Sequence, residues 1–408
     1  MTAQHTAPKV LRTEGLANPY TAFAAMREEQ AVHRVETPDG AEIWFITRYA
    51  EARAAMSDPR LSKSPASVGA RWAAVAAQPT DGEDMALVRH LLNLDPPDHT
   101  RLRKLVLKAF TSRRMEAIRG RIQAITDGLL DDVAAVDGPV DLLAEFAFQL
   151  PITVICELLG IPLDERDTFQ RWSNTLSTLV ADEEGQQRVV VAAKELSEYL
   201  RLLVARKERE PDDDLLTAWI EARDDDQRLS QDELTSMAFL LLVGGHETTV
   251  HLISNAVLAL LTHPGQLAAV RADPGLVPGV IEEVLRWEGS VAAGTWRYAL
   301  EPIDDYGGDP IPEGAPVLVS LAAADRDPEK YENPDELDVT RDAQGHLAFG
   351  HGPHYCIGAA LARMEGQIAI GSLLARFTDL RLAVPAEELR WREGLLIRGV
   401  HTLPVVAG

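Results

Sequence analysis

Cysteine is scarce in this sequence, because only two of the 408 residues, Cys156 and Cys356, carry a thiol. Two thiols so far apart cannot form a disulfide framework for a chain of this length, which favours a reducing compartment. Positive charge is also in short supply: 40 lysines and arginines face 63 aspartates and glutamates, which gives a net charge of −23. Such a surface repels nucleic-acid phosphates and anionic lipids, so neither is expected as a partner.

Long apolar runs are missing as well. The purest one, AFLLLV at 238–243, is far shorter than the roughly 20 residues of a membrane-spanning helix. The N-terminal stretch contains no apolar core of signal-peptide length. These absences predict a soluble, cytoplasmic protein.

Helical periodicity is what the sequence does contain. Apolar residues recur at three- and four-residue spacing through most of 96–290, and 46% hydrophobic residues allow a large buried core. Ser230, followed three positions later by Glu233, is typical of a helix N-cap. Short strands are predicted at 43–49 and between 297 and 320. We therefore predict a mainly α fold with a minor β part: one large domain over 16–408, after a flexible arm at 1–15.

The two cysteines have different surroundings. Cys156 lies in an apolar helical stretch and is interpreted as a small buried hydrophobe. Cys356 lies in FGHGPHYCIG, residues 349–358, a glycine-rich loop that leads into a strong helix pattern. A thiolate at a helix N-terminus is stabilised by the helix dipole and by backbone N–H groups. The sequence therefore predicts a metal-bound thiolate at Cys356.

Zinc is the first alternative, since His351, His354 and Cys356 cluster in this loop. Structural zinc requires four ligands from well-spaced pairs, and no second Cys/His pair partners this one. His246 and His251 are five positions apart, whereas the metalloprotease motif places its histidines at i and i+4. Spacing therefore disfavours zinc at both places.

The loop resembles the haem-binding loop of the cytochrome P450 family, FxxGxxxCxG, with Phe349, Gly352, Cys356 and Gly358 at the defining positions. EVLR resembles the ExxR pair of that family, GGHETT its oxygen-activating segment, and DPPDHTRLR its bacterial haem-propionate segment. The four motifs stand in the family order, and the resemblance covers nearly the whole chain. It is strongest to soluble bacterial members that tailor macrolides and other polyketides.

The resemblance implies a haem b held between two core helices, with the Cys356 thiolate as axial iron ligand. Phe349 is then expected to shield the sulfur. Cations and hydrogen-bond donors are needed for the two propionates, and glycines allow a close approach of the backbone. The cofactor-binding set that the resemblance implies is completed by His99, Arg103, Arg297 and His354 for the propionates and by Gly244, Gly352 and Gly358.

Catalysis is assigned by the same resemblance to Glu247 and Thr248, as an acid and an alcohol that assist oxygen activation and proton supply. The alternative for Thr248 is a hydrogen bond to a carbonyl one turn earlier, and both can hold. Gly244 stands where the family usually has alanine. Glu283 and Arg286, with Arg341 as a third member, are expected to be structural and to fix the loop before Cys356.

Electrons must come from partners, because no flavin or nicotinamide fingerprint is convincing. Eight lysines or arginines but only one acid, Glu116, occur between 101 and 121. The family likeness makes this run a docking surface for an acidic ferredoxin, with NAD(P)H and a ferredoxin reductase upstream. The alternative is a solvated helix face. A monomer is expected.

The substrate is predicted to be large and apolar, because the expected pocket walls are apolar and partly small. They include Trp172, Val243, Gly244, Val291, Ala292 and Leu396. The predicted reaction is insertion of one oxygen atom, by hydroxylation or epoxidation, into a macrolide or other polyketide. A steroid-like or terpenoid substrate and a peroxide-driven enzyme remain as alternatives, whereas a haem sensor or electron carrier would not need Glu247 and Thr248.

Overall fold

The computed structural model describes residues 9–10, 18–37, 40–72, 89–177, 183–223 and 227–407. Helices dominate, as predicted. They are α2 (Tyr20–Glu29), α3 (Tyr49–Ala55), α5 (Asp98–Ala109), α6 (Ser112–Ala117), α7 (Arg119–Ala134), α8 (Gln149–Leu158), α9 (Arg166–Ser177), α10 (Glu183–Arg209), α11 (Leu215–Glu221), α12 (Gln231–Thr262), α13 (Pro264–Ala272), α14 (Val277–Glu288), α15 (Leu321–Ala324) and α16 (Ala359–Arg376).

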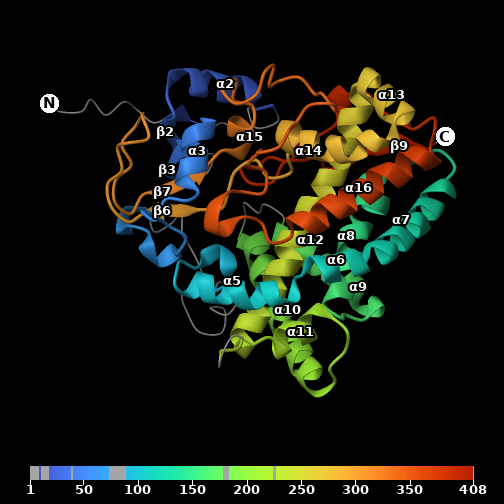
Figure 1. Ribbon diagram of the computed structural model, residues 1–408, viewed down its shortest axis with the longest axis horizontal. Helices are drawn as coiled ribbons and strands as arrows, with labels where there is room; N and C mark the ends of the chain where they lie inside the picture. The colour runs from blue at the N-terminus through green and yellow to red at the C-terminus, as the bar shows by residue number, and fades with distance from the viewer. Residues whose placement is uncertain are drawn as a thin grey trace.

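The minor β part consists of two sheets. The larger has the strand order β1-β2-β3-β7-β6-β4 and the smaller the order β5-β9-β8. Their strands are β1 (Lys9–Val10), β2 (Val32–Glu36), β3 (Glu42–Ile46), β4 (Leu61–Ser62), β5 (Pro139–Asp141), β6 (Arg297–Ala299), β7 (Pro316–Val319), β8 (Arg381–Leu382) and β9 (Pro404–Val406). Strand β3 pairs with β7 in parallel, Phe45 opposite Leu318, so the N-terminal hairpin is completed by a strand from late in the chain. Figure 1 shows this sheet with α2 and α3 at one side of the molecule, and α7, α8 and α16 at the other.

The predicted mainly α fold with a minor β part is confirmed, and so are the strands near 43–49 and within 297–320. The strand predicted at 43–49 is β3, which ends at Ile46. Helix α3 begins three residues later, at Tyr49. Of the predicted arm at 1–15, Lys9 and Val10 form β1 and pair in parallel with β2. The rest of that arm lies outside the described residues.

Helix α12 runs through the middle of the protein (Figure 1). It begins with the predicted capping box: the Ser230 side chain accepts from the Glu233 backbone N–H, and the Glu233 carboxylate accepts from the Ser230 N–H. Among the described residues this is the one helix long and apolar enough to cross a membrane, but 61% of the relevant window is buried inside the protein. The core helix of a soluble protein can be equally long and apolar, because apolar neighbours in the protein cover it.

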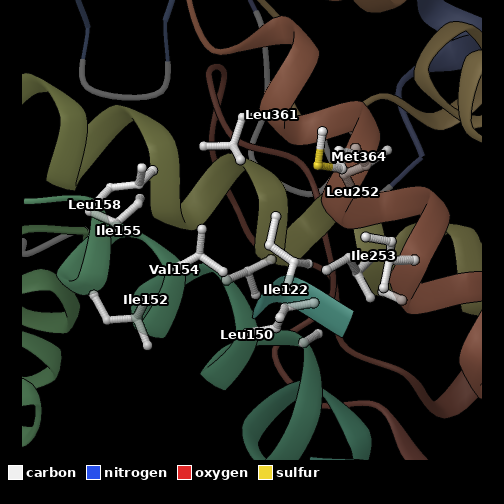
Figure 2. Close-up of a cluster of buried hydrophobic side chains, with 14 of the residues drawn as sticks. Ile122, Leu150, Ile152, Val154, Ile155, Leu158, Leu252, Ile253, Leu361 and Met364 are labelled. Carbon is white, nitrogen blue, oxygen red and sulfur yellow. The ribbon is translucent and has the colours of Figure 1, made fainter. Parts of the chain in front are cut away.

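The main core lies where α7, α8 and α16 pack on α12. Figure 2 shows Ile122 of α7, Val154 and Ile155 of α8, and Ile253 of α12 in one cluster of buried hydrophobic side chains. All four are at most 2% exposed. Each such side chain stabilises the fold by about 1.5–3 kcal/mol relative to an exposed position. Cys156 on α8 is fully buried in this core, as predicted.

Glu365 is an exception within this core. Its side chain on α16 is 1% exposed, and its Oε2 has no hydrogen-bond partner in the described chain. Burial raises the pKa of this carboxyl to about 8. Between the ordinary carboxyl range near pH 4.5 and pH 8 the folded protein therefore holds a proton that the unfolded chain has lost, so stability falls as the pH rises through this window.

We expect Glu365→Gln to remove this part of the pH dependence, because the amide needs no proton to stay neutral. Between pH 5.5 and 8 the mutant should lose less stability than the wild type, by at most about 1.4 kcal/mol per pH unit. Thermal midpoints measured across this range test the expectation. Glu387→Gln, at an exposed carboxylate, is the control and should keep the wild-type slope; the same slope in Glu365→Gln would contradict a neutral buried Glu365.

Candidate active site

One cavity collects most of the predicted site residues. It holds about 1590 Å³ of empty space, its open mouth included, and its walls come from α5, α12, the segment 290–297 and the loop before α16. The cavity therefore lies between the two core helices α12 and α16, where the resemblance places a haem.

Cys356 lies in this wall. Cys356 is exposed to the cavity. Its backbone N–H donates to the Phe349 carbonyl at 2.9 Å, which closes the loop. Burial raises the pKa of the Cys356 thiol, while the N–H groups of Gly358 and Ala359 at the start of α16 and the charges of Arg103 and Arg363 act in the opposite direction. The loop thus provides N–H donors for a thiolate, and a bond to a metal ion would complete the stabilisation of that thiolate.

The loop glycines have separate tasks. Gly350 and Gly352 both have φ of +73°, a region that other residues rarely adopt. A Cβ atom on Gly352 would lie 2.3 Å from the Ser57 hydroxyl, so this glycine lets the loop pack against the segment after α3. Gly350 and Gly358 line the cavity, whereas Gly352 is not among the lining residues.

Phe349 also lines the cavity. The Arg363 guanidinium lies 4.4 Å from the centre of its ring, a cation–π contact that fixes the ring beside the loop. Its role as the shield of the sulfur remains a prediction.

Four basic side chains meet at another part of the wall: His99, Arg103, Arg297 and His354. The rings of His99 and His354 are 4.1 Å apart, and Arg103 donates to the Tyr355 carbonyl at 2.6 Å. None of the four forms an ion pair with an acid in the part of the chain that the structure describes. His99 Nε2 and His354 Nδ1 are buried there without a hydrogen-bond partner.

Arg103 and Arg297 give this cluster a positive potential, and no ion pair with an acid balances it in the described chain. Burial lowers the pKa of His354 to about 3, with further contributions from His99, Lys63, Arg297 and Arg103. Buried cations are stable only when paired, so the cluster fits a ligand with carboxylates. An apolar cavity with a thiol in one wall and unpaired cations in another matches a haem, whose two propionates supply the missing charges.

Helix α12 presents its glycines to the same cavity. Gly244, Gly245 and Thr248 all line it. The Thr248 hydroxyl donates to the Gly244 carbonyl at 2.8 Å, so the expected hydrogen bond to the preceding turn is present while the side chain still faces the cavity. Both interpretations of Thr248 are compatible with this geometry.

Glu247 is oriented differently. It is not among the residues that line the cavity. Its carboxylate forms an ion pair with Arg392 at 2.8 Å, with the two side chains 16% and 26% exposed. The C-terminal segment thereby holds the acid on a neighbouring face of α12, and its part in proton supply remains a prediction.

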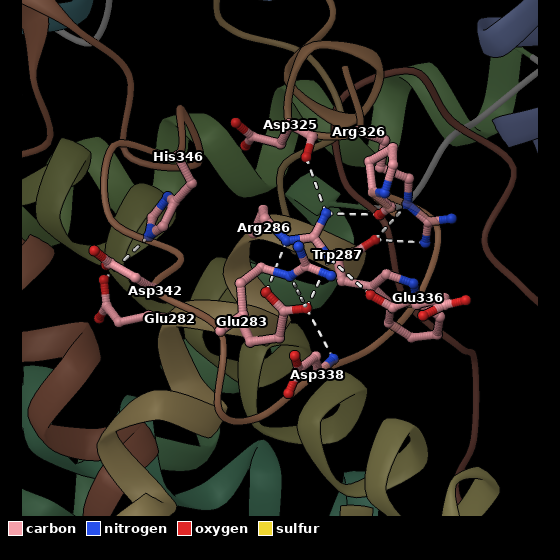
Figure 3. A network of polar contacts seen from close by, with 12 residues as sticks. Glu282, Glu283, Arg286, Trp287, Asp325, Arg326, Glu336, Asp338, Asp342 and His346 are labelled. Atoms are coloured by element: carbon pink, nitrogen blue, oxygen red, sulfur yellow. Dashed lines mark hydrogen bonds and ion pairs between the residues drawn. The ribbon is translucent and has the colours of Figure 1, made fainter. Parts of the chain in front are cut away.

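The structure brings Glu283, Arg286 and Arg341 together, and Figure 3 shows the pair of Glu283 and Arg286. Glu283 and Arg286 are fully buried and paired at 2.7 Å, and Arg341 Nε donates to Glu283 at 3.2 Å. Arg286 also donates to the carbonyls of Asp325, Pro334 and Glu336. The Asp325 carboxylate in turn accepts from the Leu347 N–H at 2.7 Å. The network therefore fixes the chain just before Phe349.

A second network escaped the sequence motifs. Glu282 accepts from Arg363 at 2.6 Å and contacts His346 Nε2 at 3.2 Å, which joins α14, the loop and α16. Burial alone would raise the pKa of Glu282, but the hydrogen bonds from His346 and Arg363 hold it down at about 2. The only cue in the sequence is that Glu282 precedes the ExxR pair directly.

Comparison with known proteins identifies the family. The profile described as Cytochrome P450 matches residues 75–387. The chain is a cytochrome P450. It is 52% identical over 393 residues to Cytochrome P450 107B1 of Saccharopolyspora erythraea, with 95% of each chain covered, and 47% identical to the Vitamin D(3) 25-hydroxylase of Pseudonocardia autotrophica, with 96% and 94% covered. Among solved structures, the tirandamycin C-bound P450 monooxygenase TamI aligns with a TM-score of 0.88 at 46% identity, covering 98% of this chain and 100% of that one.

This P450 is therefore a haem-thiolate monooxygenase that works with redox partners and an organic substrate. When bound, the haem supplies the oxygen chemistry, and a thiolate ligand favours cleavage of the O–O bond. His99, Arg103, Arg297 and His354 would hold the propionates, the apolar walls would exclude water, and the Thr248 hydroxyl faces the cavity.

The predicted substrate residues divide into two groups. Gly244 and Val291 line the cavity of the P450, whereas Trp172, Val243, Ala292 and Leu396 are not among its described lining residues. The Trp172 indole donates to Glu195, and Ala292 packs in the core beneath the large sheet. Apolar lining residues that no motif pointed to are Leu91, Leu92, Val106, Leu240 and Leu241. The sequence also predicts pocket walls from the loop at 62–95 and from Leu179; residues 73–88 of that loop, and Leu179, lie outside the described residues.

Proposed function

We propose that this P450 inserts one atom of O₂ into a macrolide or another large polyketide, by hydroxylation or epoxidation. The observation that carries the proposal is the apolar cavity above Cys356, whose few polar side chains, such as Thr248, leave most of its wall without hydrogen-bond groups. Such a wall suits a bulky substrate with little fixed polar recognition. Close relatives are hydroxylases and epoxidases of polyketide and macrolide pathways, which supports this substrate class.

A binding screen tests the substrate class. Displacement of water by a substrate shifts the spin state of haem iron, so purified protein can be titrated with macrolactones, steroids and terpenes. We expect macrolactones to give the largest shift at the lowest concentration. A preference for steroids, consistent with the similarity to a vitamin D(3) hydroxylase, would replace the macrolide proposal with the second candidate.

The source of electrons belongs to the same proposal. We assign haem b as the cofactor and NAD(P)H as the electron source, through a ferredoxin reductase and a ferredoxin, to a cytoplasmic, monomeric, single-domain enzyme. Turnover with these partners is compared with turnover by peroxide alone. Product formed only with peroxide would favour the peroxide-driven alternative.

The basic run at 101–121 supports ferredoxin docking over a smaller area than the sequence predicts. Ion pairs join Arg101 to Glu233, Arg119 to Glu116 and Arg121 to Glu157. Arg103 lines the cavity, and Arg114 donates to the Asp214 carbonyl at 2.7 Å. Lys104, Lys108 and Arg113 of this run are exposed, and the Lys108 ammonium group donates to the Arg223 carbonyl. Helix α5, which carries Lys104 and Lys108, is tied to the cysteine loop by the contact of Arg103 with Tyr355. Arg113 lies on α6, the next helix along the chain. This arrangement supports docking on the side of the cavity that holds Cys356.

We expect Arg113→Glu to slow reduction by an acidic ferredoxin about threefold to tenfold at low salt, because attraction between opposite charges accelerates association. Stopped-flow reduction under CO, at low and high salt, measures the effect. Arg188→Glu on α10, at an exposed arginine paired within its own helix, is the matched control. Equal rates for Arg113→Glu and the wild type would remove this surface from the proposal. Arg114 is unsuitable for the same test, since its substitution also releases Asp214.

A further inference from the structure

Lys63 is a buried cation that neither the motifs nor the resemblance singled out. It follows β4 directly, and its side chain is 2% exposed. Its Nζ donates to the Thr295 hydroxyl oxygen at 2.5 Å and to the Trp296 carbonyl at 2.5 Å. No acid lies within ion-pair distance of it in the described chain. A buried ammonium group without a counter-charge is unfavourable, so its retention requires an explanation.

The contact with Thr295 fixes the direction of a proton. An ammonium group only donates hydrogen bonds, so the Thr295 oxygen accepts from Lys63 and its own O–H proton must point elsewhere. Thr295 lines the cavity and is exposed to it, whereas Lys63 is covered behind it. Lys63 thus presents the Thr295 hydroxyl to the cavity as a hydrogen-bond donor.

Lys63 also interacts electrostatically with two members of the group formed by His99, Arg103, Arg297 and His354. Burial lowers the pKa of Lys63 well below its ordinary value, with a further contribution from Arg297, and Asp95 acts in the opposite direction. Lys63 in turn contributes to the lowered pKa of His354. The Asp95 carboxylate accepts from the Lys63 backbone N–H at 2.8 Å and from the Ser62 hydroxyl, so it anchors the backbone and forms no ion pair with the ammonium group.

We propose that Lys63 is a positioning residue of the haem-propionate site: it directs the Thr295 hydroxyl toward a propionate carboxylate and adds a positive charge to those of Arg103 and Arg297. The buried ammonium then has its missing counter-charge whenever haem is present. Hydrogen bonds to charged groups are stronger than those between neutral groups, so the Thr295 hydroxyl is expected to affect how tightly haem is retained.

The test uses the haem-loaded protein. In Lys63→Met we expect haem to transfer to apomyoglobin at least about tenfold faster than from the wild type, a factor that corresponds to about 1.4 kcal/mol. The midpoint potential of the iron should also become more negative, because a positive charge that disfavours the ferric state has been removed. Lys194→Met, at an exposed lysine on α10, should change neither quantity.

Two further variants separate positioning from simple bracing of the chain at 295–296. Thr295→Val removes the hydroxyl at nearly constant volume and should accelerate haem loss, while Thr295→Ser should resemble the wild type. If the Lys63→Met protein cannot be produced in folded form, the comparison of Thr295→Val with Thr295→Ser alone decides the proposal, since neither of these substitutions removes a charge. Wild-type haem loss in both Lys63→Met and Thr295→Val would overturn it. So would faster loss from Lys63→Met with an unchanged potential and no effect of Thr295→Val, because that combination describes a brace only.

Discussion

Cys356→Ser is expected to abolish the absorption band that marks a thiolate-bound, CO-bound ferrous haem, and with it the monooxygenase activity. A serine hydroxyl is a poorer electron donor than a thiolate, so the ligand contribution to O–O cleavage is lost. Loss of outer-sphere groups around a metal commonly costs tenfold to a hundredfold in affinity or activity. Loss of the ligand itself should therefore reduce turnover by more than about a hundredfold.

The chain provides a matched control for this substitution. Cys156→Ser alters the second thiol, which is fully buried in the core and away from the cavity lining. It should lower stability but leave the position of the band unchanged. A thiolate-type band in Cys356→Ser would show that another group ligates the iron, and would undo the assignment of the site.

Glu283→Ala is expected to yield little haem-loaded protein. The substitution leaves Arg286, which is fully buried, and Arg341 without their shared carboxylate. Breaking a buried ion pair from one side costs about 3–5 kcal/mol, and the affected segment leads directly into the cysteine loop. The ratio of haem to protein absorbance after purification measures the effect.

Glu336→Ala is the control for Glu283→Ala. Arg286 contacts only the backbone carbonyl of Glu336, and the side chain is exposed, so its haem content should match the wild type. Full haem incorporation in Glu283→Ala would show that the network does not fix the loop.

The predictable part of the site was local in sequence. The spacing within 349–358 defines a loop whose N–H donors, positive-φ glycines and following helix all come from neighbouring residues. His99 and Arg103 are one helical turn apart, so their common direction followed from helix geometry. The capping box at Ser230 was predictable for the same reason.

The unpredictable part depends on partners that are distant in sequence. Glu247 forms an ion pair with Arg392 of the C-terminal segment, and most of the basic residues in the run contact residues of other elements. Whether Trp172 or Ala292 reaches a cavity depends on how whole elements pack, which periodicity does not encode. Lys63 gave no signal at all, because one lysine in a short strand-and-turn stretch is ordinarily a surface residue.

Contacts between segments that are far apart in the sequence also constrain the order of events during synthesis of the chain. Strand β3 is completed by β7, the thiol at Cys356 follows later still, and Arg392 reaches back to the middle of α12. Gly399 also packs closely against that helix, since a Cβ atom there would lie 2.1 Å from His251 Nδ1. Proteins are synthesised from the N-terminus at about 5–20 residues per second, so on the ribosome the haem pocket lacks its ligand and its C-terminal brace until most of the chain has emerged. Cofactor capture that requires both the thiol and this C-terminal contact is therefore expected late in the synthesis of the chain.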